Sequence, residues 1–341
     1  MFERIGVLVL SALMMFPAGY FAWGSEGHRI VAKIATKNLS PDARKKLEAI
    51  LGTNDSGLEA AMTTAATWPD DGLDKKKTQT GDWHFVDVPV TVPFAIGTLC
   101  DADNCVINRV LEMSRRLQMN ESDFTMAAPP DKPRPMTSQE LAFLIHFVGD
   151  IHQPLHSANN GDRGGNCDNL TTSLKHSDGS KPTTELHAAW DVDEVLAGFK
   201  VLGNETAIAN ALFQRFKNGA SVQQLTPTDW AHEAYDLAKK DVYQKLGIPA
   251  HTAPPGQCAL GIKKVNVTQQ YLDSNVPDVE TQLMRAGIRL SRIINQICAG
   301  AGCQANPPRA KPSCVLPSKK ACRSKVVHSF SQSSPLLCGA S

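Results

Sequence analysis

The stretch IHFVGDIHQPLH, residues 145–156, constrains the fold and chemistry of this chain more than any other. It overlaps the end of an apolar run that spans 141–151. The run follows the sequence TSQE at 137–140, a capping-box pattern that predicts the first turn of a helix. Pro154 lacks the backbone N–H that a helix interior needs, so we expect the helix to stop before it.

Two pairs of side chains have the spacing of metal ligands. His146 and Asp150 are four residues apart, so a helix places both on one face. His187 and Asp191, in the sequence ELHAAWD, repeat this spacing, and His156 follows the first pair. An imidazole and a carboxylate on one helical face can hold a divalent metal together. One such pair alone more often makes a surface hydrogen bond, but two pairs with His156 favour a metal site.

Three upstream motifs add residues of the same chemistry. His28 lies in WGSEGH, Asp70 in TWPDD and His84 in DWHFVD. Each of these residues alone is more often structural than a ligand. Together with the two pairs they form a set of nitrogen and oxygen ligands without sulfur, which suits zinc in a catalytic cluster. Such a cluster activates water and stabilises charge in a displacement at phosphorus.

The rest of the chain is also mostly helical in pattern. Helices are predicted, in chain order, at 26–38, 41–51 with an N-cap at Ser40, 141–151, 184–198, 205–217, 228–245 and 279–298. The alternation at Trp83–Val88 is a strand candidate. Loops rich in Pro, Gly, Asn and Asp are predicted at 86–105, 119–136, 157–183 and 247–277. We therefore expect a mainly α, multi-helix single domain over 23–299, with long loops and little β structure.

Both ends of the chain differ from this central region. Residues 5–18 form an apolar run that is too short to span a bilayer and typical of a secretory signal peptide, here 1–22. Cleavage would make Trp23 the first residue of a secreted or periplasmic protein. Tyr20 is an unusual residue to find near a signal-peptide cleavage site. The alternatives to a cleaved signal peptide are an uncleaved anchor and a buried helix. No later run reaches the length of a membrane span, so we expect no membrane contact of the mature chain.

Residues 300–341 form a basic tail containing Pro, Ser and Cys, which we expect to be poorly ordered.

The charges are balanced overall but not along the chain. The formal net charge is +1. Residues 301–341 hold six basic side chains and no acid, whereas residues 23–300 hold 28 basic and 33 acidic ones. The overall balance gives no reason to expect tight binding of duplex DNA. A mildly acidic body is compatible with several bound cations, because cations need carboxylate ligands.

The sequence contains nine cysteines. Cys100 and Cys105 are close enough for a small local disulfide loop, and secretion would permit disulfide bonds. The sequence leaves the pairing of the others open, and an odd number leaves at least one outside intramolecular pairs. No pair of CxxC elements occurs, which argues against a cysteine zinc finger.

Together the motifs resemble the zinc-dependent single-strand nucleases and 3′-nucleotidases of the S1/P1 type. WGSEGH, WPD, HFVD, HFVGDIHQPLH, DRGGN and HAAWD occur in the order of that family, between Trp23 and about Ala299. The resemblance implies a mainly helical fold, of the type shared with zinc-dependent phospholipase C, with three Zn²⁺ ions at the bottom of a cleft. It also implies the residues that hold the ions: Asp70, His84, His146 and Asp150 for the first; His156, His187 and Asp191 for the second; His28, a bridging Asp150, and the α-amino group and carbonyl of Trp23 for the third.

The same resemblance implies the reaction. The protein would be a monomeric secreted endonuclease that hydrolyses single-stranded DNA and RNA to 5′-nucleotides, with 3′-nucleotidase activity, by attack of a metal-activated water on phosphorus. Asp70 would orient that water and accept its proton. Phe85 would stack on a base and Asn166 would hydrogen-bond to it, with Gly165 allowing close approach of the backbone. The first basic residue after Asp70 is Lys75, further along the chain than in some members.

Two other functions compete with this one. A zinc-dependent phospholipase C has a similar fold and an N-terminal tryptophan. We would expect a phospholipase C to have glutamate in place of Asp191. We would also expect its tryptophan and its next histidine to be further apart than Trp23 and His28, which are separated by five residues. A non-catalytic zinc-binding secreted protein is disfavoured because every expected ligand position is occupied.

Overall fold

The computed structural model describes residues 23–71, 80–118, 136–172, 174, 181–259 and 264–299, which all belong to one compact unit. The expected signal peptide, Lys75, nearly all of the loop predicted at 119–136, and the tail at 300–341 lie outside these residues. Helices dominate the described part of the chain, and its strands are short. The predicted mainly α fold class is therefore confirmed. In the same part of the chain no helix combines the length and the apolar character that a membrane span requires.

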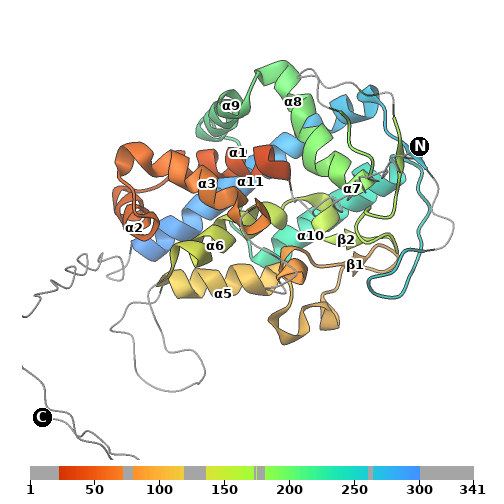
Figure 1. The fold of residues 1–341 in the computed structure, drawn as a ribbon, viewed down its shortest axis with the longest axis horizontal. Helices are drawn as coiled ribbons and strands as arrows, with labels where there is room; N and C mark the ends of the chain where they lie inside the picture. Colours follow the sequence, from red (N-terminus) through yellow and green to blue (C-terminus); the bar gives the residue numbers. More distant parts are fainter. Residues whose placement is uncertain are drawn as a thin grey trace, which may run out of the picture. The chain divides into compact units, whose positions relative to one another are not determined.

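Figure 1 shows how the helices and strands follow one another. The α-helices are α1 (Gly24–Lys37), α2 (Pro41–Leu51), α3 (Leu58–Asp71), α5 (Val106–Gln118), α6 (Ser138–Asp150), α7 (Leu186–Ala188), α8 (Glu194–Leu202), α9 (Glu205–Lys217), α10 (Pro227–Leu237) and α11 (Gln269–Cys298). The strands are β1 (Val88–Pro89), β2 (Ala158–Asn159), β3 (Leu170–Thr171) and β4 (Val265–Asn266); β1 pairs with β2 and β3 with β4, both in parallel. Shorter 3₁₀ turns occupy Asp55–Gly57, Gly81–His84, Gly97–Asp103 and Pro154–His156, and π-helical turns occupy Ala189–Asp193 and Ala238–Gln244.

The core that carries the site forms around α6 (Figure 1). α6 packs against α3, α5 and α11, and α1 packs against α3, α9 and α11. Every residue of α6 from Leu141 to Asp150 is buried. Ile30 and Ile34 of α1 are fully buried as well, so the apolar side of that helix faces inward. Because α6 is enclosed by several neighbours, any ligand that it carries has a fixed position.

The helix starts predicted from capping patterns are confirmed. The hydroxyl of Ser40 accepts a hydrogen bond from the first turn of α2. Thr137 and Glu140 form the reciprocal capping box at the start of α6. α6 ends at Asp150, before Pro154, as expected from the missing proline N–H.

The last helix is longer than the sequence pattern predicted. The predicted loop at 247–277 and helix start near 279 are wrong at their boundary, because α11 begins at Gln269 and runs through Pro277. A proline removes one backbone hydrogen bond inside a helix. Here the carbonyl that loses its partner belongs to Asp273, an exposed residue. Buried residues before and after the proline keep the helix packed.

The strand predicted at Trp83–Val88 is wrong over most of its length. Trp83 lies in the 3₁₀ turn Gly81–His84, and only Val88 belongs to a strand, β1. The alternation of apolar and polar residues reflects an extended segment in which every second side chain is buried. Phe85 and Asp87 therefore share the less buried face of this segment. A period of two predicts which side chains share a face, but not whether a partner strand is present.

Gly287 of α11 lies at the crossing of α1 and α11, and it generates a test of this packing. A Cβ atom there would lie 2.5 Å from both Cβ and Cγ2 of Ile34. We expect Gly287→Ala to destabilise the protein by about 1–3 kcal/mol, because the two helices would have to move apart. The free energy of unfolding in urea measures this effect.

Gly198 of α8 is the matched control for Gly287. It is also helical and buried, but the nearest atom to a Cβ built on it is Ile208 Cδ1 at 3.9 Å. Gly198→Ala should therefore be neutral, or stabilise the protein by about 0.5–1 kcal/mol, because alanine loses less backbone entropy in a helix. Equal effects of the two substitutions would contradict the close packing of α1 on α11.

Candidate metal centre

Among the described residues, three groups of His and Asp side chains could each hold a metal ion. We call them the first cluster (Asp70, His84, His146), the second cluster (His156, His187, Asp191) and the third cluster (His28, His146, Asp150). Within each cluster the ligand atoms all lie within 4.8 Å of one another. The structure thus brings together every histidine and aspartate that the family resemblance assigned to zinc.

Separate elements build the first cluster. Asp70 lies near the end of α3, His84 ends the 3₁₀ turn Gly81–His84, and His146 lies on α6. His146 Nε2 is 3.1 Å from His84 Nδ1 and 3.6 Å from Asp70 Oδ1. Because α3 packs on α6, the carboxylate of Asp70 reaches an imidazole that is distant in the sequence.

Asp150 connects the first and third clusters. Its Oδ2 atom is 2.9 Å from His84 Nδ1 and 3.4 Å from His146 Nε2. Its Oδ1 atom is 3.3 Å from His28 Nε2. The rings of His28 and His146 stack, with centroids 3.9 Å apart. A carboxylate with one oxygen toward each cluster has the geometry that a bridging ligand requires.

The second cluster joins the turn after α6 to the α7 region. His156 lies in the 3₁₀ turn Pro154–His156, His187 in α7, and Asp191 in the π-helical turn that follows. His156 Nε2 and His187 Nε2 are 3.1 Å apart, and Asp191 Oδ2 is 3.4 Å from His187 Nε2. Interruptions of an α-helix by a π-helical turn are frequent at functional sites, and this one carries a candidate ligand.

Hydrogen bonds from the Nδ1 atoms of three candidate histidines indicate that their Nε2 atoms, which lie within the clusters, can bind a cation. The Nδ1 atoms of His146, His156 and His187 each lie 2.6–2.7 Å from a backbone carbonyl, to which they can donate. Burial lowers the pKa of His187, which keeps this ring neutral. In a neutral ring that donates from Nδ1, Nε2 is an acceptor, and two acceptors that face each other repel. A metal ion between His156 and His187 would convert this repulsion into coordination, so these residues fit a metal.

Asp191 also contacts the residue expected to become the mature terminus. Its Oδ1 atom accepts hydrogen bonds from the backbone nitrogen of Trp23 at 3.1 Å and from Gln153 Nε2 at 2.6 Å. The Trp23 side chain is fully buried, which anchors the start of α1 beside the site. Gln153 was not predicted as part of the site, although it lies inside the stretch 145–156.

A cavity of about 410 Å³ lies beside the first and second clusters. His84, His156 and His187 line it, together with Phe85 and Asn166. Its volume is in the range of sites that bind small molecules or single nucleotide units. Two of the predicted substrate contacts therefore lie in the same cavity as three of the candidate ligands.

Gly164 and Gly165 allow the DRGGN loop to lie against the second cluster. Both have positive φ angles. A Cβ atom on Gly164 would lie 2.5 Å from the carbonyl oxygen of Leu155, and one on Gly165 would lie 3.1 Å from the backbone nitrogen of His187. Glycine is the residue that fits both positions. The close approach expected for Gly165 is thus an approach to the protein itself, to Leu155 and His187, which line the cavity.

Part of the cavity wall was not predicted from the sequence, namely Asp87, Arg163, Pro255 and Gly256. The alternation at Trp83–Val88 could have found Asp87, because it places Asp87 on the same face as Phe85. No local signal marks Pro255 and Gly256 as part of a site, since they belong to a segment predicted as a loop.

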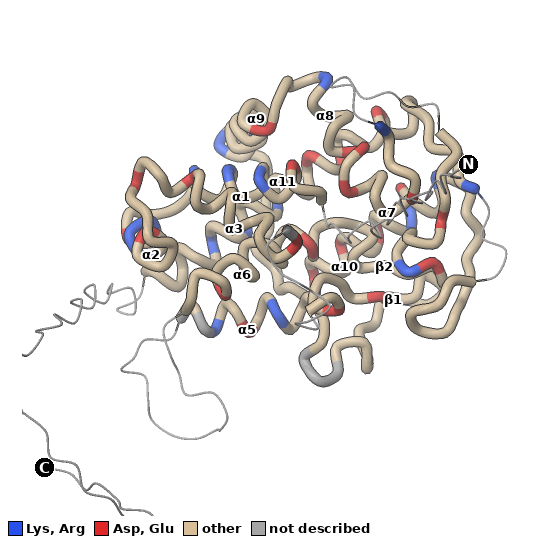
Figure 2. Tube along the Cα trace, viewed as in Figure 1, with Lys and Arg blue, Asp and Glu red and all other residues tan. Residues whose placement is uncertain are grey.

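Carboxyl groups dominate the electrostatics next to this wall. Burial and the carboxylate of Asp162 raise the pKa of Asp87 to about 6. Burial and the same carboxylate raise the pKa of Asp168 to about 8. Figure 2 shows acidic positions among α6, α7 and α8, the part of the fold that carries the clusters. The raised pKa values mean that Asp87 and Asp168 hold their protons more tightly than exposed carboxyl groups, and a cation bound nearby would favour their ionised forms.

One family and several known proteins are similar to this chain. The model of the S1/P1 nuclease family matches residues 23–299. The chain is 28% identical to nuclease P1 of Penicillium citrinum over 299 residues, which cover 81% of this chain and 97% of the relative. It is 28% identical to nuclease S1 of Aspergillus oryzae over 296 residues, or 82% of this chain and 93% of the relative. It is also 28% identical to endonuclease 3 of Arabidopsis thaliana over 311 residues, or 86% and 94%.

Gly149 of α6 leaves room for His28, which makes the third cluster testable. A Cβ atom on Gly149 would lie 2.7 Å from His28 Nδ1 and 2.9 Å from His28 Cε1. We expect Gly149→Ala to displace the ring and to weaken metal binding at the third cluster by about 10–100-fold, as changes next to a ligand do. Titration of the metal-free protein with zinc, followed by mass spectrometry, measures this. Gly198→Ala is the control, and an unchanged zinc affinity of Gly149→Ala would contradict the placement of His28.

Proposed function

The chain belongs to the S1/P1 nuclease family, and from this premise we propose that it is a secreted, zinc-dependent endonuclease of single strands. Membership makes it a nuclease, a hydrolase of phosphodiester bonds. The proposal adds that it cleaves both DNA and RNA to 5′-nucleotides, removes the phosphate of 3′-nucleotides, and acts as a monomer. The observation that carries the proposal is the presence of three candidate metal clusters, the first and second of which lie beside a cavity lined by an aromatic ring.

We assign one zinc ion to each cluster, with His146 as a ligand of the first ion only, because its Nδ1 atom contacts a backbone carbonyl and its Nε2 atom can bind one metal. Asp150 would join the ligands of the first cluster and bridge to the third, since its two oxygens face different clusters. The nitrogen and carbonyl of Trp23 would complete the third set. Apart from the Trp23 nitrogen and carbonyl, the donor atoms are imidazole nitrogens and carboxylate oxygens, which zinc accepts in catalytic sites.

Bound zinc would lower the pKa of a water molecule and stabilise negative charge at phosphorus. The chain itself contributes side chains that surround the reacting atoms, among them the carboxylate of Asp70. Asp70 Oδ1 lies 3.6 Å from His146 Nε2 and 3.9 Å from His84 Nδ1, so this carboxylate faces the centre of the first cluster. We propose that Asp70 orients the attacking water and accepts its proton.

Phe85 and Asn166 supply the substrate contacts in this proposal. Stacking on Phe85 tolerates any base, but it requires that base to be unpaired, which favours single strands. Asn166 Nδ2 donates to the carbonyl of Arg163 at 2.7 Å, which fixes the orientation of the amide. A fixed amide presents the same hydrogen-bonding atoms to every base that enters. Arg163 also lines the cavity and offers a positive charge near a bound phosphate.

Secretion belongs to the proposal because removal of residues 1–22 would change the chemistry of Trp23. An amide nitrogen shares its lone pair with the neighbouring carbonyl, whereas a free amine can donate that pair to a metal. The Trp23 nitrogen lies 3.1 Å from Asp191 Oδ1, at the edge of the second cluster. Processing would therefore convert this nitrogen into an amine that can serve as the proposed ligand.

Metal removal tests the proposed activity directly. We expect the processed protein to release acid-soluble nucleotides from single-stranded DNA, and a zinc chelator to reduce this release to background, because the proposed reaction needs a metal-activated water. Restored zinc should restore the release, and duplex DNA of the same sequence is the matched substrate control. Hydrolysis of phosphatidylcholine without hydrolysis of nucleic acid would instead establish a phospholipase C.

A blocked terminus tests the role assigned to Trp23. We expect a variant with a short peptide ahead of Trp23 to bind about one zinc ion fewer per chain and to lose most of its activity, because the amine ligand is missing. The peptide should carry a protease site, so that cleavage of the same sample restores both properties. Full zinc content and full activity before cleavage would refute the amine ligand. Metal analysis and the nucleotide-release assay give the two readouts.

A further inference from the structure

A disulfide that the sequence did not predict lies directly beside the cavity. Cys167 follows Asn166, which lines the cavity, and it is bonded to Cys258, 91 residues further along the chain. Cys258 in turn follows Pro255 and Gly256, which also line the cavity. The disulfide therefore joins two parts of the wall that come from distant segments.

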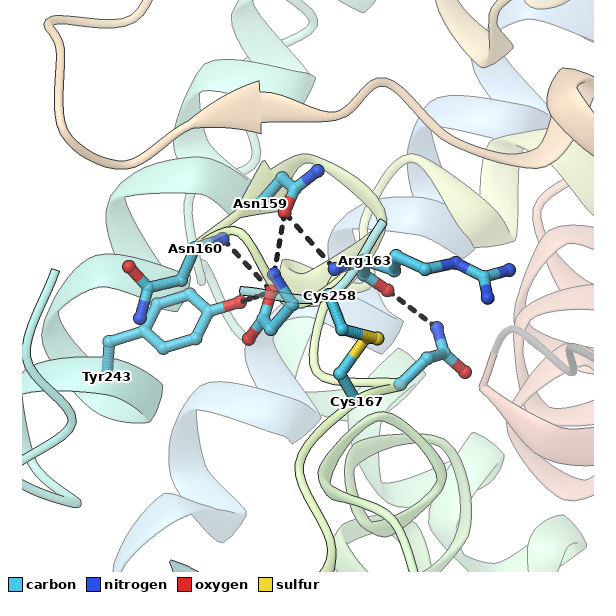
Figure 3. Close-up of a disulfide and its surroundings, with 8 residues drawn as sticks. Asn159, Asn160, Arg163, Cys167, Tyr243 and Cys258 are labelled. Carbon is cyan, nitrogen blue, oxygen red and sulfur yellow. Dashed lines mark hydrogen bonds between the residues drawn. A yellow bond between two sulfur atoms is a disulfide. The ribbon is translucent and has the colours of Figure 1, made fainter. Parts of the chain in front are cut away.

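Residues 249–259, which we call the strap, lie along the loop that contains the DRGGN sequence. Asn160 binds the beginning of the strap with both ends of its amide: Nδ2 donates to the carbonyl of Pro249 at 3.0 Å, and Oδ1 accepts from the backbone N–H of His251 at 2.8 Å. The end of the strap is bound by Ala259, whose N–H donates to the carbonyl of Gly161 at 2.7 Å. Figure 3 shows the disulfide between Cys167 and Cys258, with Asn159, Asn160, Arg163 and Tyr243 in the same region.

The middle of the strap touches the loop at Gly161. This glycine has a φ of 71°, and a Cβ atom on it would lie 2.9 Å from the carbonyl carbon of Thr252 and 3.0 Å from the nitrogen of Ala253. Backbone therefore packs against backbone at this point, which leaves the strap no room to move inward.

The part of the strap that reaches the cavity is a tight turn. The N–H of Gln257 donates to the carbonyl of Pro254 at 3.0 Å, and Gly256 has a φ of 73°. Proline at the second position and glycine with positive φ at the third are the signature of a type II β-turn. Pro255 fixes one backbone angle of this turn, so the turn enters the wall as a rigid unit.

The loop beneath the strap is itself held firmly. The N–H groups of Asp162 and Arg163 both donate to Asn159 Oδ1, at 3.1 and 3.2 Å. Asp162 Oδ1 accepts from the N–H of Asn160 and from the hydroxyl of Tyr243. A strap that is tied to a rigid loop keeps the distance between its turn and Asn166 constant.

We propose that the strap is a specificity-determining wall, and that the Cys167–Cys258 disulfide fixes it so that the cavity encloses one unpaired nucleobase. This inference rests on the proposed function, because it gives the cavity a nucleotide substrate. The wall adds Pro255 to a cavity that already contains the ring of Phe85. A preformed wall binds a base without the cost of ordering a loop at each encounter. The strap should therefore strengthen the binding of substrates that carry a base. It should not affect the hydrolysis step at phosphorus.

The experiment compares a nucleoside 3′-monophosphate with ribose 3-phosphate, which lacks the base. In the double variant Cys167→Ser/Cys258→Ser we expect KM for the nucleotide to rise about tenfold, which corresponds to about 1.4 kcal/mol of lost binding. We expect KM for ribose 3-phosphate, and kcat for both substrates, to stay within about twofold of the wild type. Zinc content should be unchanged, since neither cysteine is a proposed ligand. Circular dichroism sets an assay temperature at which the variant is folded.

Two further variants keep the test decisive. Cys100→Ser/Cys105→Ser removes the other disulfide found among the described residues, which does not contribute to the cavity wall, and should leave both KM values unchanged. Pro255→Ala keeps the strap disulfide but removes the proline ring, and should raise KM for the nucleotide alone. It replaces the double cysteine variant if that variant does not fold.

The outcomes separate the inference from the function on which it rests. An active wild type whose strap variants leave KM for the nucleotide unchanged, or raise KM for both substrates equally, would overturn the inference and leave the nuclease intact. A zinc-loaded wild type that hydrolyses neither substrate nor single-stranded DNA would overturn the proposed function, and the inference with it. A selective rise in KM for the nucleotide supports both.

Discussion

The two oxygens of Asp150 impose the constraint on which the rest of the site depends. The carboxylate is fully buried, and it faces His84 and His146 with one oxygen and His28 with the other. A buried carboxylate is costly unless positive charge compensates it. Metal ions would supply that charge on both sides, and the surrounding packing is arranged to admit them. α6 is enclosed by other helices, so Asp150 cannot turn away, and the glycine before it gives His28 the space to approach.

The same site is assembled from segments that are far apart in the chain, which links its parts to one another. His156 contacts the carbonyl of His84, and His187 contacts that of Gly164, so the first and second clusters share their supports. His152, which is buried just after α6, contacts Arg289 of α11. Burial and the positive charge of that guanidinium both lower the pKa of His152. Hydrogen bonds and packing thus hold the candidate ligands in position, and the proposed amine of Trp23 would be added by processing. The disulfide connects the strap to the loop that carries Asn166, beside the same cavity.

Much of the fold and of the candidate site could be predicted from sequence because local rules apply to them. Capping patterns placed the starts of α2 and α6, and the four-residue spacing of His146 and Asp150 put both residues on one helical face. The family resemblance supplied the grouping of the ligands, which no spacing alone provides. Other features depend on contacts that a sequence does not display. α5 was missed although Val106, Val110, Met113 and Leu117 have helical spacing and are buried, so here the signal was present and overlooked. The run of α11 through Pro277 is accompanied by buried residues on both sides of the proline, and the strap depends on a pairing of cysteines that spacing cannot reveal.

Diffraction from crystals of the processed protein, recorded on both sides of the zinc absorption edge, tests the central claim most directly. It locates zinc without reference to activity, substrate or affinity. We predict three anomalous peaks per chain, one in each of the three clusters, with Asp150 between the first and third. The third peak should lie within bonding distance of His28 and the Trp23 nitrogen. Peaks confined to two clusters, or a zinc ion at His28 that does not touch the terminal nitrogen, would contradict the proposed centre.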